Sequence, residues 1–100
     1  MQVLLVEDHP LFREGLAHAL RTLDPSTVVF EAADGDAALA LAVLHRDIDI
    51  VLLDLHLSGR DGLEIMLPLR ELLVRVPVLV VSASEEKREV RRAIQAGARG

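Results

Sequence analysis

One short apolar run, residues 48–53, limits most strictly what this chain can fold into. Five of its six residues are branched apolar side chains, and Asp54 follows directly. A run of this length and composition is typical of a strand that is buried on both faces, as in a parallel sheet. Open parallel sheets collect functional groups just beyond the carboxyl ends of their strands. The run therefore predicts both a class of fold and a place for chemistry, at Asp54.

The rest of the chain alternates β-prone runs with helical patterns. Further β-prone runs cover residues 2–6, 27–32 and 78–81, and apolar residues recur at helical spacing between and after them. Strands that alternate with helices indicate a parallel, doubly wound sheet. A chain of 100 residues without a second zone of composition is expected to form one domain, residues 1–100. The predicted fold class is α/β, a flavodoxin-like parallel sheet with strand order 2-1-3-4.

The helical segments carry three local predictions. In the first helix, Phe12, Leu16 and Leu20 recur at helical spacing and are expected to lie in the core. Pro68 lies inside a later helical pattern and is expected to kink that helix or split it, because proline lacks the N–H group that a helix interior needs. Residues 57–62 contain glycine and polar residues and are expected to form a loop.

Composition excludes several classes of function. The net charge of −5 leaves no positive face with which this segment could bind the phosphates of nucleic acid by itself. Two phenylalanines are the only aromatic residues, too few for a base-stacking platform. No apolar run approaches the roughly 18–20 residues of a membrane span, and the first residues do not resemble a signal peptide. Without cysteine there is no disulfide frame, and a cytoplasmic location is expected.

Polar side chains follow three of the predicted strands. Glu7 and Asp8 follow the first, Asp54 the third and Ser82 the fourth. Since the first and third strands are neighbours in the order 2-1-3-4, Asp8 and Asp54 are expected to lie side by side with Glu7 close. Three crowded carboxylates need a cation or a proton to coexist, and oxygen ligands suit Mg²⁺. A carboxylate can also attack a phosphoryl group, so the four residues indicate an acceptor for phosphate.

Other polar residues favour structural roles. The histidines at positions 9, 18, 45 and 56 lack the spacing of metal ligands and are interpreted as surface or loop residues. The arginines of residues 88–92 are interpreted as a solvated helix face, with a docking surface as the alternative. Residues 50–54 are similar to a Walker B strand. No glycine-rich phosphate loop accompanies them, which argues against a nucleotide hydrolase.

Four motifs, in order along the chain, resemble a response regulator receiver domain. Residues 6–16 are similar to the opening of receivers attached to LuxR/NarL-type helix-turn-helix output domains. Residues 54–64 resemble the phosphoacceptor loop, residues 80–83 the fourth strand, and residues 96–100 the turn before the fifth strand. The resemblance covers all 100 residues. It implies a CheY-like fold and a phosphoprotein of two-component signalling that regulates transcription.

The resemblance also implies roles for matching residues. Asp54 would be the phosphoacceptor, with a histidine kinase as its phosphodonor. The cofactor Mg²⁺ would be held by Glu7, Asp8 and Asp54, together with the backbone carbonyl of His56. These expectations make the acidic residues the centre of the function.

The match is less complete beyond the acidic residues. Ser82 would be the hydroxyl that shifts toward the phosphoryl group, while Ala83 leaves space beside it and Ser84 tunes dephosphorylation. Family members usually have proline where this chain has Ser58. They also have a lysine after a fifth strand, and the only lysine here, Lys87, does not match it. The fifth strand and fifth helix are expected to be absent, which leaves an open edge and predicts self-association.

Three hypotheses remain open. The first is a phosphoacceptor domain, not an enzyme, that controls a missing DNA-binding output domain. It would contact DNA only through that domain and no membrane at all. The second is a degenerate receiver that acts only in dimerisation. The third is a phosphohydrolase with an aspartate nucleophile, which is disfavoured because such enzymes often have a second acid where this chain has His56.

Overall fold

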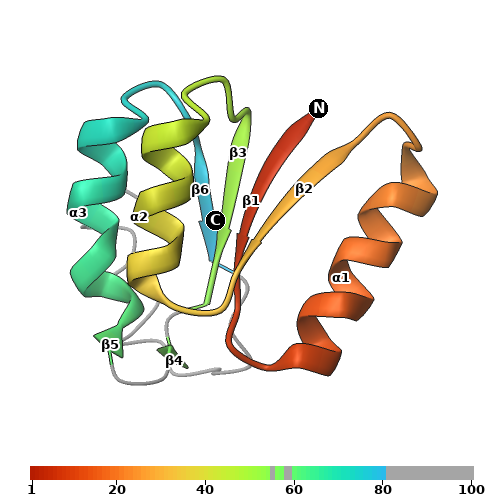
Figure 1. The fold of residues 1–100 in the computed structure, drawn as a ribbon, viewed down its shortest axis with the longest axis horizontal. Helices are drawn as coiled ribbons and strands as arrows, with labels where there is room; N and C mark the ends of the chain where they lie inside the picture. The colour runs from red at the N-terminus through yellow and green to blue at the C-terminus, as the bar shows by residue number, and fades with distance from the viewer. Residues whose placement is uncertain (55, 58–59, 81–100) are drawn as a thin grey trace.

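The computed structural model describes residues 1–54, 56–57 and 60–80. The elements along the chain are β1 (Gln2–Val6), α1 (Pro10–Leu23), β2 (Val28–Ala32), α2 (Gly35–Leu44), β3 (Ile50–Leu53), β4 (His56–Leu57), β5 (Arg60–Asp61), α3 (Gly62–Leu72) and β6 (Val78–Val80). Four strands form a parallel sheet in the order β2-β1-β3-β6 (Figure 1). With β6 as the fourth strand, this confirms the predicted order 2-1-3-4.

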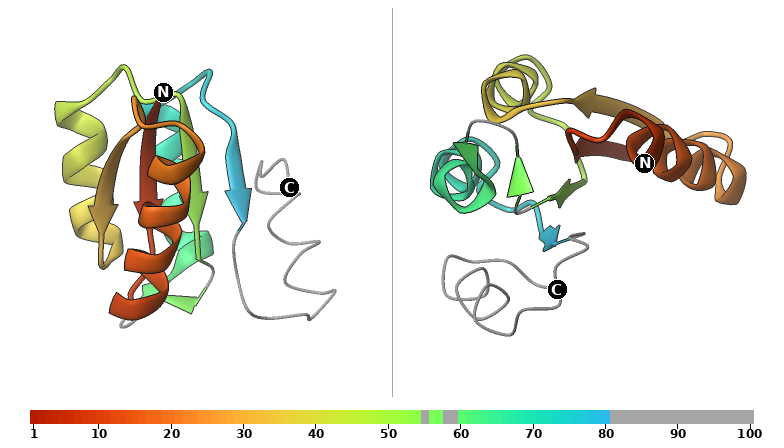
Figure 2. Two further views of the ribbon diagram at one scale, coloured as in Figure 1. Left: turned by 90° about the vertical axis from the view of Figure 1, so that its right-hand side faces the viewer. Right: turned by 90° about the horizontal axis from the view of Figure 1, so that it is seen from below.

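Helices cover both faces of the four-stranded sheet. α2 and α3 lie side by side on one face, and α1 lies on the other (Figures 1 and 2). Leu4 and Leu53 are buried toward α2 and α3, whereas Leu5 and Leu52 are buried toward α1. Successive residues of a strand point to opposite faces, so both central strands must be apolar throughout. This explains the continuous apolar run that precedes Asp54.

The sheet-facing side of α1 differs from the predicted one. Leu16 and Leu20 pack against the sheet as expected, together with the buried Ala17, but Phe12 is 48% exposed. The prediction that Phe12 lies in the core is therefore wrong. The stripe formed by residues 16, 17 and 20 continues one turn earlier at Arg13, which is 20% exposed, because neighbours on a helix face are three or four residues apart. Phe12 lies beside this stripe and remains in contact with solvent.

Two predictions for the segment after Asp54 are also corrected: the loop of residues 57–62, and a split at Pro68, which was one of two expected outcomes there. β4 and β5 pair antiparallel, with His56 opposite Asp61 and Leu57 opposite Arg60, where a loop was expected. Two residues separate the paired strands along the chain, which is the commonest spacing in a β-hairpin. α3 is not split by Pro68 but runs unbroken from Gly62 to Leu72.

Packing explains why α3 tolerates its proline. Ile65, Met66 and Leu69 lie on both sides of Pro68 in the sequence and are completely buried against the core. A proline inside a helix costs about 3 kcal/mol through its missing hydrogen bond and its ring. Complete burial of each large apolar side chain contributes about 1.5–3 kcal/mol, so three such anchors outweigh this cost.

A side-chain cap fixes the start of α2. Asp34 has an extended backbone, and its Oδ1 accepts a hydrogen bond of 2.8 Å from the backbone N–H of Ala37. We expect Asp34→Ala to lower the free energy of unfolding by about 1 kcal/mol, since it leaves that N–H without its cap. Asp34→Asn is the matched control and should cost much less, because asparagine caps about as well. Urea denaturation followed by circular dichroism measures both, and equal losses would contradict the capping role.

Several predictions fall on residues that the structure does not describe. These are the roles of Ser82, Ala83 and Ser84, the proline position at Ser58, and the arginine cluster at 88–92. Within the described part of the chain, no helix is both long enough and apolar enough to cross a bilayer.

Candidate functional site

The acidic residues are held at one end of the sheet by its own hydrogen bonds. Val6, the last residue of β1, lies opposite Leu53, the last residue of β3. Beyond this pair, the backbone N–H of Asp54 donates to the carbonyl of Val6 at 2.9 Å. The N–H of Glu7 donates to the carbonyl of Ala32 in β2 at 3.0 Å. Both acids are therefore fixed in register at the carboxyl ends of neighbouring strands.

The structure brings three carboxylates together, as predicted. Glu7, Asp8, His9 and Asp54 each offer one ligand atom, and these atoms lie within 4.8 Å of one another. The side chain of Glu7 is 2% exposed and that of Asp8 is 14% exposed, and Asp54 is 3% exposed. The three acids are separated by as many as 47 residues along the chain and meet only because β1 and β3 are neighbours.

Burial makes this carboxylate cluster electrostatically unfavourable. Loss of water around Glu7 raises the pKa of its carboxyl group, and the nearby charge of Asp54 adds to the rise. Hydrogen bonds from His9 act in the opposite direction on the same pKa. The pKa of His9 is raised in turn, first by its hydrogen bond to Glu7 and then by the charge of Asp8. The cluster thus favours any positive charge placed beside it.

His9 lies beside the acidic cluster, which the spacing of the four histidines did not indicate. Its ring is 70% exposed, as predicted for a surface residue, but Nδ1 lies 2.6 Å from Oε1 of Glu7 and 3.1 Å from Oδ1 of Asp8. The available signal was its position directly after the two acids in the sequence. Of the others, His18 is exposed on α1, and His45 stacks on Phe30 with ring centroids 4.1 Å apart. His56 lies in β4.

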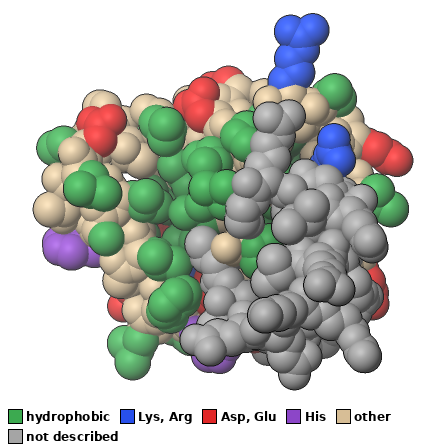
Figure 3. Space-filling view, turned by 180° about the vertical axis from the view of Figure 1, so that it is seen from behind, with side chains coloured by type: hydrophobic (Ala, Val, Ile, Leu, Met, Phe, Trp, Pro, Cys, Tyr) green, Lys and Arg blue, Asp and Glu red, His purple; other side chains and the backbone are tan. Residues whose placement is uncertain are grey.

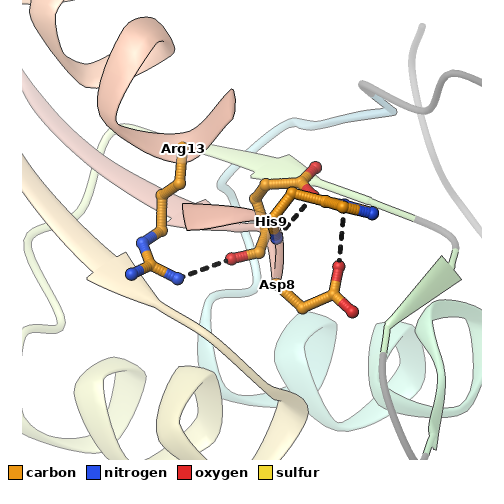
Figure 4. A network of polar contacts seen from close by, with 4 residues as sticks. Asp8, His9 and Arg13 are labelled. Carbon is orange, nitrogen blue, oxygen red and sulfur yellow. Dashed lines mark hydrogen bonds and ion pairs between the residues drawn. The ribbon is translucent and has the colours of Figure 1, made fainter. Parts of the chain in front are cut away.

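Arg13 supports the cluster from the first turn of α1, and its role was not predicted. Its Nη1 donates to the backbone carbonyl of Glu7 at 3.0 Å, and its Nε donates to Oε1 of Glu31 in β2 at 3.3 Å. Figure 4 shows the guanidinium reaching the backbone from the side opposite His9. One side chain thereby ties α1 to the ends of both β1 and β2.

We expect Arg13→Ala to lower the free energy of unfolding by about 1–3 kcal/mol, because the half-enclosed carbonyl of Glu7 loses its charged donor. It should also weaken binding of divalent cations, since the turn that carries Glu7 is no longer held. Arg21→Ala is the matched control: Arg21 is 50% exposed and 4.0 Å from Glu31, so its loss should change stability by less than about 0.5 kcal/mol. Denaturation and calorimetric titration with Mg²⁺ would measure both effects, and a similar loss in the two variants would contradict this role for Arg13.

The donor set fits a hard divalent cation. Three carboxylates supply oxygen ligands. A bound cation would also stabilise the negative charge of Glu7, which burial disfavours. Mg²⁺ binds in proteins through one or two carboxylates and keeps several waters. A carboxylate beside such an ion is also a nucleophile toward phosphorus, because the ion neutralises the charge on the transferring oxygens.

Comparison with known proteins identifies the family. The response regulator receiver domain family matches residues 3–100. The nitrate/nitrite response regulator protein NarP of Escherichia coli is 43% identical over 100 residues, which cover 99% of this chain and 46% of the relative. The chain thus spans slightly less than half the length of that curated relative.

Solved structures agree with the match in sequence. The signal receiver domain of the putative response regulator NarL from Mycobacterium tuberculosis has a TM-score of 0.83 and 42% identity, covering 97% of this chain and 77% of that one. The CheX–CheY–BeF3–Mg²⁺ complex from Borrelia burgdorferi has a TM-score of 0.89 and 26% identity, covering 99% of this chain and 74% of that one. With its fold and its acidic cluster, the chain belongs to the response regulator receiver domains of two-component systems, and its relatives include transcriptional regulators of the NarL and NarP type.

Proposed function

We propose that this domain accepts a phosphoryl group on Asp54 from a histidine kinase. A carboxylate oxygen of Asp54 attacks phosphorus, the bond from phosphorus to the kinase histidine breaks, and that nitrogen leaves with its electron pair. The product is an acyl phosphate on Asp54. The observation that carries the proposal is the convergence of Glu7, Asp8 and Asp54 at the carboxyl ends of β1 and β3.

The same convergence supports a role for Mg²⁺. Glu7, Asp8 and Asp54 would hold the ion together with the backbone carbonyl of His56, and the bound ion supplies positive charge against the transferring oxygens. The Borrelia complex, whose fold is similar, contains Mg²⁺ and a beryllium fluoride, which supports this assignment. By resemblance, Ser82 would bind a phosphoryl oxygen, Ala83 would leave it space, and Ser84 would tune its loss.

The regulated output would be transcriptional. The similarity to NarP and NarL supports one receiver domain, residues 1–100, that controls a DNA-binding output domain in the cytoplasm. Receiver domains of these regulators are not classical enzymes, so phosphorylation would change a surface rather than turn over a substrate.

Intact-mass spectrometry tests the proposal. The protein is incubated with Mg²⁺ and a small phosphodonor such as acetyl phosphate, and its mass is measured over time. We expect one phosphoryl group per chain, no adduct in excess chelator, and none in Asp54→Asn. Continuous release of inorganic phosphate over many turnovers would instead support the phosphohydrolase. Absence of both an adduct and release of phosphate would support a purely structural role in assembly.

Self-association through the edge of the sheet stays a prediction. β6 is the last strand of the sheet in the described part of the chain, and large apolar side chains are exposed elsewhere, among them Leu11, Leu23 and Val74. Figure 3 shows apolar side chains gathered on the rear face. Exposed apolar surface promotes association. We expect a mass above that of the monomer in light scattering at moderate concentration, and a strictly monomeric folded protein would contradict this.

A further inference from the structure

We propose that His9 is a direct ligand of the cation site, and that its Nδ1 gives an electron pair to the ion beside the carboxylates of Glu7 and Asp8. The site would then bind borderline transition ions such as Zn²⁺ more tightly than the acidic residues alone would. The inference rests on the proposed function in one respect, namely that the acidic cluster binds a divalent cation. It adds a nitrogen ligand, and with it a selectivity among ions, that the three acids do not supply.

Nδ1 of His9 lies close to carboxylate oxygens of both Glu7 and Asp8. Nδ1 lies 2.6 Å from Oε1 of Glu7 and 3.1 Å from Oδ1 of Asp8 (Figure 4). Ligands of a tetrahedral zinc ion, each about 2.0–2.1 Å from the metal, are separated from one another by roughly 3.3 Å. Nδ1 and the Asp8 oxygen, 3.1 Å apart, are already near this separation. The 2.6 Å between Nδ1 and Glu7 is a hydrogen bond, which an arriving ion must replace by displacing the shared proton. Asp54 completes a group whose ligand atoms span at most 4.8 Å.

Hydrogen bonds hold the backbone of His9 beside the acids. The N–H of His9 donates to Oε1 of Glu7 at 3.0 Å, the same oxygen that contacts Nδ1. The carbonyl of His9 accepts from the N–H of Arg13 at 2.9 Å. His9 occupies the N-cap position of α1, yet its side chain makes no capping hydrogen bond. Its polar ring atom therefore faces the acids instead of the helix terminus.

The chemistry of the ligands determines which ions bind more tightly. Imidazole nitrogen suits Zn²⁺, Ni²⁺ and Cu²⁺, whereas Mg²⁺ takes oxygen ligands and retains its waters. A nitrogen beside the carboxylates of Glu7 and Asp8 should raise affinity for Zn²⁺ while leaving affinity for Mg²⁺ nearly unchanged. The exposed position of the ring lets it turn toward an arriving ion without disturbing the core.

Calorimetric titration with Zn²⁺ and with Mg²⁺ is the first test, on the parent protein, His9→Ala and His18→Ala. We expect His9→Ala to raise the Kd for Zn²⁺ at least about tenfold and to change that for Mg²⁺ by less than about threefold. His18, which is exposed on α1, is the matched control and should change neither. Equal Zn²⁺ affinity in His9→Ala and the parent would overturn the proposal.

Nitrogen-15 NMR of the histidine rings gives a second measurement that needs no variant. On addition of Zn²⁺, the Nδ1 resonance of His9 should move to the position of a metal-bound nitrogen, while His18 and His45 stay unchanged. Binding of Zn²⁺ without that shift would overturn the role of His9 and leave the carboxylate site intact. Absence of binding by both ions, or binding that Asp8→Asn and Asp54→Asn leave unaffected, would overturn the proposed function as well.

Discussion

Asp54→Asn should abolish phosphorylation completely while leaving a protein at least as stable as the parent. The amide that replaces the carboxylate is not a nucleophile toward phosphorus, so no acyl phosphate can form. The same change removes one of three neighbouring acids from an enclosed position where Asp54 raises the pKa of Glu7. Loss of that repulsion compensates for any polar contact that the carboxylate makes. Intact mass reports the first effect, and thermal unfolding in excess chelator reports the second.

The response to Mg²⁺ should also disappear in Asp54→Asn. A ligand that binds only the folded state adds about 2.7 kcal/mol to the free energy of unfolding at a concentration one hundred times its Kd. We expect the parent to show this gain and Asp54→Asn to show little of it at the same Mg²⁺ concentration. Asp47→Asn is the matched control, because Asp47 is exposed in the turn before β3, at the other end of the sheet. A phosphoryl adduct that persists in Asp54→Asn would place the acceptor elsewhere.

Leu4→Ala should bring the domain close to unfolding. Leu4 lies in the middle of β1, which is hydrogen-bonded to strands on both sides, and its side chain is completely buried toward α2 and α3. Truncation of a buried leucine to alanine costs about 2–5 kcal/mol, because the cavity is only partly filled by relaxation. A domain of this size has a total free energy of unfolding of about 5–15 kcal/mol. Urea denaturation should therefore show a large fall in the midpoint.

The matched control for this core substitution is Leu44→Ala near the end of α2. Leu44 is 75% exposed, so its truncation removes little buried surface and should change stability by less than about 0.5 kcal/mol. Comparable losses in Leu4→Ala and Leu44→Ala would show that burial in this structure does not determine stability. Cation binding by Leu4→Ala, measured on its folded fraction, should match that of the parent.

The sheet and its acidic cluster could be predicted from sequence because each depends on a strong local signal. The run before Asp54 is apolar at every position from 50 to 53, as a strand covered on both faces requires. Once β1 and β3 are neighbours, residues that follow directly after them must meet. The convergence of Glu7, Asp8 and Asp54 follows from that one step of topology.

The roles of Phe12 and Arg13 could not be predicted from the spacing of apolar residues alone. A helical pattern that includes Phe12 is as regular as one that includes Arg13, and only contact with the sheet distinguishes them. Arg13 is only 20% exposed, and its charged group reaches Glu31 and the carbonyl of Glu7, as a long side chain with an apolar stem and a polar end can do. Polarity scales misplace a residue of this kind.

The contacts of His9 and the continuity of α3 at Pro68 could not be predicted for a different reason. The spacing between histidines cannot indicate that a single histidine lies beside acids of two different strands. It therefore could not predict that His9 lies near Asp54. The split expected at Pro68 holds for an isolated helix, whereas Ile65, Met66 and Leu69 of α3 are completely buried against the core. Tertiary contacts determine both the position of His9 and the continuity of α3, and such contacts cannot be read from the local sequence.

The pairing of Val6 with Leu53 has a kinetic consequence. Because side chains alternate along a strand, a slip of one residue between β1 and β3 would turn the acids away from one another. A partly folded chain in which these two strands have not yet docked therefore has no place for an ion. Divalent ions should accordingly lower the rate of unfolding and leave the rate of the early folding steps unchanged. Release of the ion would then accompany separation of β1 from β3.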